Sequence, residues 1–109
     1  MVDSLRQVRQ FPVEVRKDIG VALYDAQKGG YPPGAKPFKG VGSGVFEIVS
    51  HFDGDTYRTV YAVQIGHSLY VLHAFQKKAK TGIKTPKNEV ELIQRRYRMA
   101  VKLDNENRQ

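Results

Sequence analysis

Basic side chains stand within and directly after strand-like segments in the second half of the chain. Arg58 lies inside the run 57–61, and Lys77 and Lys78 follow a later run. An arginine offers a planar fork of donors that matches a phosphate. Crowded lysines repel one another, which lowers their pKa and lets one of them accept a proton. These residue types fit cleavage of RNA by its own 2′-hydroxyl, which needs preorganised cations but neither a metal nor an enzyme nucleophile.

Other residues could complete such a site. His73 could transfer a proton, and strand alternation places it in line with Leu69, Val71 and Phe75. Tyr57 could stack on an unpaired base or guide a proton. The predicted catalytic residues are Arg58, Lys77, Lys78 and His73, and the predicted RNA-binding residues are Lys36, Lys39, Tyr57, Arg95 and Arg96.

Each of these residues also has a plainer interpretation. An arginine in mid-strand is costly to bury without a partner, so Arg58 could instead pair with Glu47 on the neighbouring strand. His73 could be a hydrogen-bonded core histidine. The lysine pair could be an ordinary charged strand end. Tyr57 and Tyr61 share a face and could be core aromatics.

The distribution of charge favours a polyanionic partner. The net charge is +7, and residues 77–102 hold nine Lys/Arg against two acids, whereas residues 1–76 hold eight against seven. Nucleic acid is the simplest partner for such a segment, and a solvated basic face is the alternative. The chain has no Cys, which excludes disulfides, Cys-ligated zinc and iron–sulfur clusters and suits a reducing cytoplasm.

Two motifs that could bind ligands are weak. The glycine-rich stretch 40–44 lacks the lysine of a phosphate-binding loop and leads into a strand, so it predicts a flexible turn. His51, Asp53 and Asp55 could hold a metal, but a hairpin turn explains them more simply. The three histidines lack zinc spacing, and no nucleophile elbow is present. We therefore expect neither a metal nor a cofactor.

Hydrophobic periodicity predicts an α+β domain over residues 1–103, followed by a polar tail at 104–109. The expected elements are a helix at 5–9 capped by Ser4, a helix from Pro12 to Gly29-Gly30, a loop at 31–44, strands at 44–52, 56–65 and 67–75, a basic link at 77–84, and a helix from Thr85-Pro86 to about Leu103. We expect the two N-terminal helices to form a hairpin, or one bent helix, and to pack together with the C-terminal helix on a small, mainly antiparallel sheet. No signal sequence or membrane span is expected.

Several short blocks together carry a family resemblance over about residues 4–103. They are Phe11-Pro12 with Val15-Arg16 and Ile19–Leu23, Lys36-Pro37-Phe38-Lys39-Gly40, Gly44–Ile48, Gly54–Tyr61, Tyr70–Lys78, and Gly82–Pro86. On these blocks the chain resembles the phage-derived, HigB-like branch of the RelE/ParE superfamily of bacterial toxins.

The resemblance implies a RelE-like fold and an endoribonuclease that cuts mRNA, usually on the translating ribosome and without a metal. It also implies a partner antitoxin with a helix-turn-helix domain. The site positions that it carries over are Arg58, Lys77, Lys78, Lys36, Lys39, His73 and Tyr57. Such toxins normally begin with a strand, for which Met1 to Asp3 leave no room, so we expect an unpaired sheet edge.

Two other function classes remain open. The ParE-like branch of the same superfamily poisons DNA gyrase by binding it, without catalysis. A plain RNA-binding domain would instead use the basic segment 77–102 for affinity. The basic set around Arg58 favours the nuclease, because a protein-binding poison does not require a phosphate site.

Overall fold

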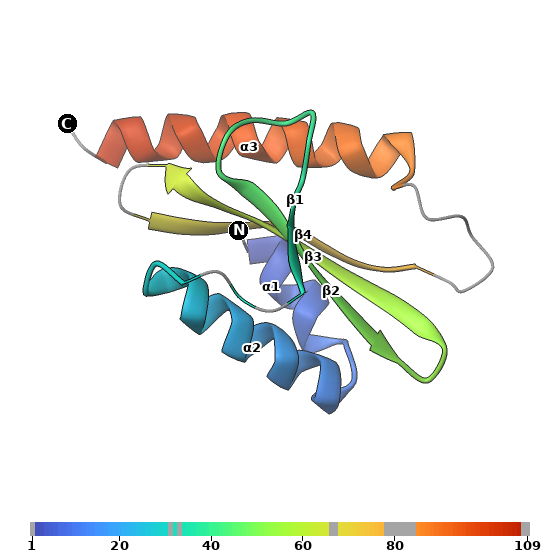
Figure 1. Ribbon diagram of the computed structural model, residues 1–109. Helices are drawn as coiled ribbons and strands as arrows, with labels where there is room; N and C mark the ends of the chain where they lie inside the picture. Colours follow the sequence, from blue (N-terminus) through green and yellow to red (C-terminus); the bar gives the residue numbers. More distant parts are fainter. Residues whose placement is uncertain (1, 31, 33, 66–67, 78–84, 108–109) are drawn as a thin grey trace.

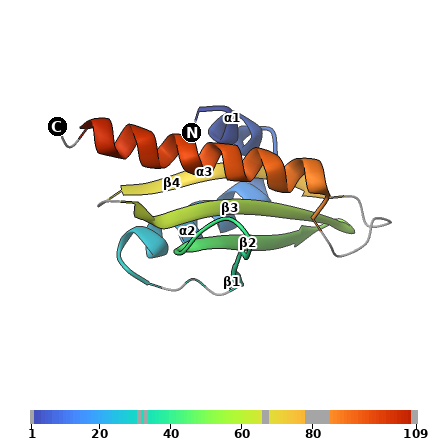
Figure 2. The same ribbon diagram turned by 90° about the horizontal axis from the view of Figure 1, so that it is seen from above.

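The computed structural model describes residues 2–30, 32, 34–65, 68–77 and 85–107. Its helices are α1 (Val2–Arg9), α2 (Val13–Gln27) and α3 (Lys87–Asn107), and its strands are β1 (Ala35–Pro37), β2 (Val45–Phe52), β3 (Asp55–Ile65) and β4 (Ser68–Lys77). The strands form one antiparallel sheet in the order β1-β2-β3-β4. Helix α2 lies on one side of this sheet and α3 on the other (Figures 1 and 2). The predicted α+β fold is therefore confirmed.

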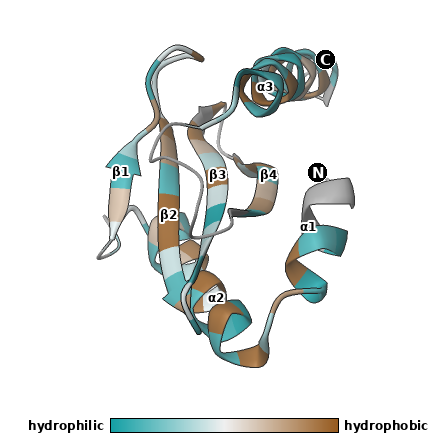
Figure 3. Ribbon diagram, turned by 90° about the vertical axis from the view of Figure 1, so that its right-hand side faces the viewer, coloured by the Kyte–Doolittle hydropathy of each residue, from teal (hydrophilic) through white to brown (hydrophobic). Residues whose placement is uncertain are grey.

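One side of the sheet, the α2 face, is buried by the apolar stripe of α2. The buried residues of that helix are spaced three or four positions apart, which places them on one face: Val15, Ile19, Ala22 and Ala26. They pack on strand side chains that include Ile48, Tyr57, Tyr61 and Ala74. Hydrophobic residues of α2 face the strands in Figure 3. Tyr57 and Tyr61 are thus core aromatics, only 5% and 1% exposed.

The opposite side, the α3 face, is covered in part by the C-terminal helix. Ile93 and Ala100 are fully buried in one cluster with Val60, Ala62 and Leu72. Val90, Tyr97 and Val101 pack against this cluster, so the apolar residues of α3 form one stripe with helical spacing. The helix runs beyond its expected end near Leu103 to Asn107, and Asp104 in this extension is only 6% exposed.

Turn chemistry explains the hairpin and the glycine-rich loop. Asp53 and Gly54 have φ of 52° and 81°, the left-handed pair that a tight two-residue hairpin turn requires. The stretch 40–44 passes close to α3, where Gln94 donates to the carbonyl of Gly40. A Cβ on Gly42 would lie 2.6 Å from the ring of Tyr97. Glycine therefore serves a close approach of loop and helix, and the expected turn is confirmed.

Three local expectations were wrong. The predicted loop 31–44 contains strand β1, which pairs with Phe46–Ile48. So short a strand depends on its tertiary pairing, and its proline is tolerated because β1 is an edge strand. Ser4 lies inside α1, which begins at Val2, and Pro12 stands at the N-cap of α2 rather than inside it.

The outer edge of the sheet at β4 lies beside α1 (Figure 3). Val8 at the end of α1 and Phe11 after it pack toward Tyr57 and Ala74. The edge of the sheet at β4 is thus accompanied by a helix. Within the described ranges, no helix is both long and apolar enough to cross a membrane.

Candidate functional site

Strand register brings ionisable residues from all four strands to the α3 face. Lys36 pairs with Glu47, Glu47 with Val60, and Val60 with His73, so these residues form one row across the sheet. Arg58 lies in the adjacent row, opposite Phe75. Residues directly opposite in an antiparallel pair have Cβ atoms about 5 Å apart, and diagonal neighbours are within reach of long side chains. The row therefore assembles a cluster that is spread over 38 positions of sequence.

The centre of this cluster is a buried ion pair. Arg58 Nη1 lies 2.9 Å from Glu47 Oε1, and the two residues are 9% and 8% exposed. The pairing of Arg58 with Glu47, expected as an alternative from the sequence, is confirmed. Glu47 Oε2 is buried and accepts no hydrogen bond from the described residues. Glu47 therefore keeps acceptor capacity that the described residues do not use, and a hydroxyl could reach it only after the pair opens toward the α3 face.

His73 is held by α3 through both ring nitrogens. Its Nε2 contacts the carboxylate of Glu89, and Arg96 Nη1 lies 3.2 Å from its Nδ1. Arg96 also donates to the carbonyl of Leu72 at 2.9 Å. Because a guanidinium only donates, Nδ1 must accept and Nε2 must carry the proton that faces Glu89. This arrangement is the hydrogen-bonded core histidine that was the plainer interpretation of His73.

A β-bulge places His73 toward α3. Val60 pairs with His73, but the next residue, Tyr61, pairs with Val71, so β4 carries Leu72 as an extra residue. The expectation that His73 lies in line with Leu69 and Val71 was therefore wrong. His73 keeps its place beside Phe75, and their rings stack with centroids 5.2 Å apart.

Burial controls the ionisation of this histidine. Desolvation lowers the pKa of His73 below its ordinary value of 6.5, although the hydrogen bond and charge of Glu89 act in the opposite direction and Arg96 adds to the lowering. His73 is therefore neutral at pH 7. The buried cluster then holds two cations, Arg58 and Arg96, against two carboxylates, Glu47 and Glu89.

We expect this histidine to make the protein less stable in mild acid. In the unfolded chain His73 takes up a proton near pH 6.5, whereas in the folded chain it does so only at lower pH. The free energy of unfolding is therefore at its maximum above pH 6.5 and decreases as the pH falls below that value. Urea denaturation between pH 7.5 and 5 measures this. His73→Gln should flatten the profile, whereas His51→Gln, at an exposed histidine, should leave it unchanged. An unaltered profile in His73→Gln would contradict the assignment.

The other predicted site residues divide into three groups. Lys36, Lys39 and Arg95 are exposed, the first on the α3 face, so they are available to a polyanion. Tyr57 lies on the α2 face, where its ring packs on Phe11 at 4.9 Å, so its predicted contact with RNA was wrong. Arg96 is turned inward to β4, as described above. Lys77 ends β4 opposite Thr56, and Lys78 lies outside the described residues, as does most of the basic link.

The hairpin residues considered as metal ligands are used in local contacts. The Thr56 hydroxyl and His51 Nδ1 are 3.3 Å apart, and Gln76 Nε2 donates to Asp55. Over the part of the chain that the structure describes, no three His, Asp or Glu side chains gather in a way that could hold a metal ion.

The sequence did not identify Glu89 as a site residue, and it identified Glu47 only as a structural partner. Glu89 lies at the start of α3 and reaches His73 only because the helix docks there, and no local pattern signals that contact. Glu47 was considered only as a partner for Arg58. The signal that could have identified Glu47 as a candidate site residue is its position, because its carboxylate lies diagonal to an arginine in the middle of the next strand.

Comparison with known proteins gives one match. The family model described as "Phage derived protein Gp49-like (DUF891)" matches residues 6–98. No curated protein and no solved structure matches the chain. The match covers most of the chain and agrees with the phage-derived, toxin-like family predicted from the sequence, although it does not single out the HigB-like branch. The chain therefore belongs to the Gp49-like phage-derived proteins, a toxin-like family of the RelE/HigB type.

Proposed function

We propose that this chain is a metal-independent endoribonuclease toxin of the HigB-like kind, which cleaves mRNA by attack of a ribose 2′-hydroxyl on the adjacent phosphate. The observation that carries the proposal is the Glu47–Arg58 pair, held on the α3 face with one carboxylate oxygen unused among the described residues. Family membership supports the toxin class. A cognate antitoxin is part of the same proposal.

The pair divides the chemistry between two side chains. A phosphate that takes the place of Glu47 on the guanidinium fork of Arg58 leaves the carboxylate beside the neighbouring ribose. Glu47 can then accept the proton of the 2′-hydroxyl, and Arg58 stabilises the charge that develops on the phosphorane. The departing 5′-oxygen needs a proton, for which the candidates are Lys77, the last residue of β4, and Lys78, the next residue in the sequence.

We assign His73 a positioning role in this scheme. Both of its nitrogens are engaged by α3, and it lies diagonal to Arg58 across the strand pair. The imidazole therefore ties the helix to the strand that follows Arg58, rather than presenting a nitrogen to substrate. Exposed Lys36, Lys39 and Arg95 would bind the RNA backbone around the pair.

A cleavage assay on mRNA tests the function. The purified full chain is added to translating ribosomes that carry a defined mRNA, with free mRNA in parallel. EDTA is added to test whether cleavage needs a metal ion. Because EDTA also removes the Mg²⁺ that ribosomes need, it is added only to the samples with free mRNA. We expect discrete cuts that end in 2′,3′-cyclic phosphates and disappear when the nucleotide before the cut is a 2′-deoxynucleotide. Cuts that survive this replacement, or no cuts in either RNA, would contradict the proposal.

The exposed lysines should contribute measurable electrostatic binding. Lys36→Gln and Lys39→Gln should each weaken binding to single-stranded RNA and reduce the slope of log K against log salt by about 0.7. Fluorescence anisotropy with a 2′-O-methyl RNA, which cannot be cut by this route, measures it. Lys17→Gln, an exposed lysine of α2, removes the same charge from the other side of the sheet and should leave the slope unchanged. Equal losses in all three variants would indicate binding governed by net charge.

A further inference from the structure

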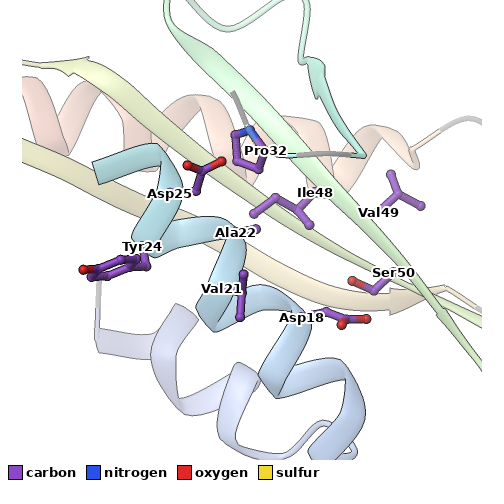
Figure 4. Close-up of a pocket in the computed structure, with 9 residues that line it drawn as sticks. All are labelled: Asp18, Val21, Ala22, Tyr24, Asp25, Pro32, Ile48, Val49 and Ser50. Atoms are coloured by element: carbon purple, nitrogen blue, oxygen red, sulfur yellow. The ribbon is translucent and has the colours of Figure 1, made fainter. Parts of the chain in front are cut away.

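A cavity of about 460 Å³ opens between α2 and β2, away from the α3 face. Figure 4 shows the side chains of α2 that line one wall and those of β2 that line the other. Its volume falls within the range of ligand-binding pockets. Nothing in the proposed nuclease mechanism uses this cavity, so it calls for a separate explanation.

The lining combines an apolar wall with negative charge. Ala22 and Ile48 are buried and form the apolar part, and the 94% buried Ser50 adds a hydroxyl that points toward α2 in Figure 4. Asp18 and Asp25 supply two carboxylates, and the described lining includes no lysine or arginine. This is unexpected in a chain of net charge +7. An anion such as RNA would be repelled here, whereas a cation on an aliphatic stem matches both features.

An aromatic ring at the cavity already has a cation beside it. Lys28 Nζ lies 4.5 Å from the centroid of the Tyr24 ring, which also lines the cavity. The face of a tyrosine ring attracts ammonium and guanidinium groups. Lys28 already occupies this ring, whose side chain points away from β2 in Figure 4, so the charge preference of the cavity rests on Asp18 and Asp25.

The surroundings favour a polypeptide over a free small amine. Val21 and Tyr24 line the cavity and remain 71% and 58% exposed. A lone cation would leave this apolar surface in water. A lysine or arginine with apolar neighbours in sequence would cover it, since interfaces gain most from an anchored cationic or aromatic side chain surrounded by apolar contact.

We propose that this cavity receives an arginine or lysine side chain from a segment of a partner protein, flanked by apolar residues. Binding there is on the α2 side of the sheet and does not involve the α3 face, where the Glu47–Arg58 pair lies. The proposal does not depend on the nuclease function and stands or falls separately from it.

NMR titration of the ¹⁵N-labelled full chain tests this site with defined probes. The probes are N-acetyl-arginine N-methylamide, its uncharged citrulline counterpart, and the acetylated tripeptide amide Val-Arg-Val. We expect saturable shifts of amides around Ala22, Ile48 and Ser50 with the arginine probe, at least tenfold weaker binding of citrulline, and at least threefold tighter binding of the tripeptide. Equal binding of the tripeptide and the single residue would overturn the proposal in favour of a free small cation.

Charge-matched variants separate a specific site from general attraction. Asp18→Asn and Asp25→Asn should each weaken the arginine probe at least threefold. Asp53→Asn, which removes an acid from the hairpin turn at a position where asparagine tolerates the same backbone, should not. Each variant is first checked for a wild-type pattern of amide shifts. Equal weakening of probe binding by all three variants, or amide shifts centred on α3, would overturn the proposal. Amide shifts at the cavity that depend on the concentration of the protein alone would also overturn it, because they would indicate that a second copy of this chain binds there.

Discussion

Replacing Arg58 with lysine should reduce RNA cleavage by about 10²–10³-fold, the effect of removing one preorganised donor from a developing oxyanion. Lysine keeps a positive charge for Glu47 but cannot offer the planar fork that binds two phosphate oxygens at once. The loss should therefore fall on the rate of the bound complex more than on RNA affinity. Single-turnover cleavage of an end-labelled RNA, with affinity measured separately by anisotropy, separates these quantities.

The matched control for this variant is Arg16→Lys. Arg16 is an exposed arginine of α2, so the same substitution there should leave the cleavage rate unchanged. Glu47→Gln removes the proposed base while keeping the side-chain shape, and it should lower the rate at least as much as Arg58→Lys. A variant Arg58→Lys that cuts at the wild-type rate would remove the forked phosphate contact from the mechanism.

Arg58→Ala should destabilise the fold by about 3–5 kcal/mol, because it leaves the Glu47 carboxylate buried without its partner. The double variant Glu47→Leu with Arg58→Met should recover most of that loss, since buried ion pairs are often replaced by apolar residues at little or no cost. Urea denaturation of the two single variants and the double variant measures the three free energies of unfolding.

The double variant also distinguishes structure from catalysis. It should fold and bind RNA but not cut it, whereas a pair that served only the fold would leave cleavage intact once stability returned. A loss below about 1 kcal/mol in Arg58→Ala would contradict the buried pair, because exposed ion pairs are worth no more than that.

The elements that sequence predicted well are those with strong local signals. The stripes of α2 and α3 follow helical periodicity, and Asp53-Gly54 fixes a two-residue turn. That turn also fixes the register of β2 with β3, which puts Val49 opposite Arg58 and leaves Glu47 on the diagonal. The central pair of the site was therefore accessible from the sequence.

The rest depends on contacts between distant segments. The extra residue Leu72 in β4 is invisible to a pattern of strict alternation, so the direction of His73 could not be predicted from its neighbours. Glu89 and Arg96 meet His73 only through the angle at which α3 crosses the sheet. Strand β1 has three residues, too few for a periodic signal, and it exists because β2 offers it an edge.

The most direct measurement induces the wild-type chain and Arg58→Lys in a bacterial host and maps mRNA ends by primer extension. The account predicts growth arrest with discrete new mRNA ends for the wild type, and neither for the variant at equal soluble levels. Arrest with intact mRNA would contradict the nuclease and favour a poison that binds a protein such as DNA gyrase. No arrest from a folded, soluble wild-type chain would contradict the account as a whole.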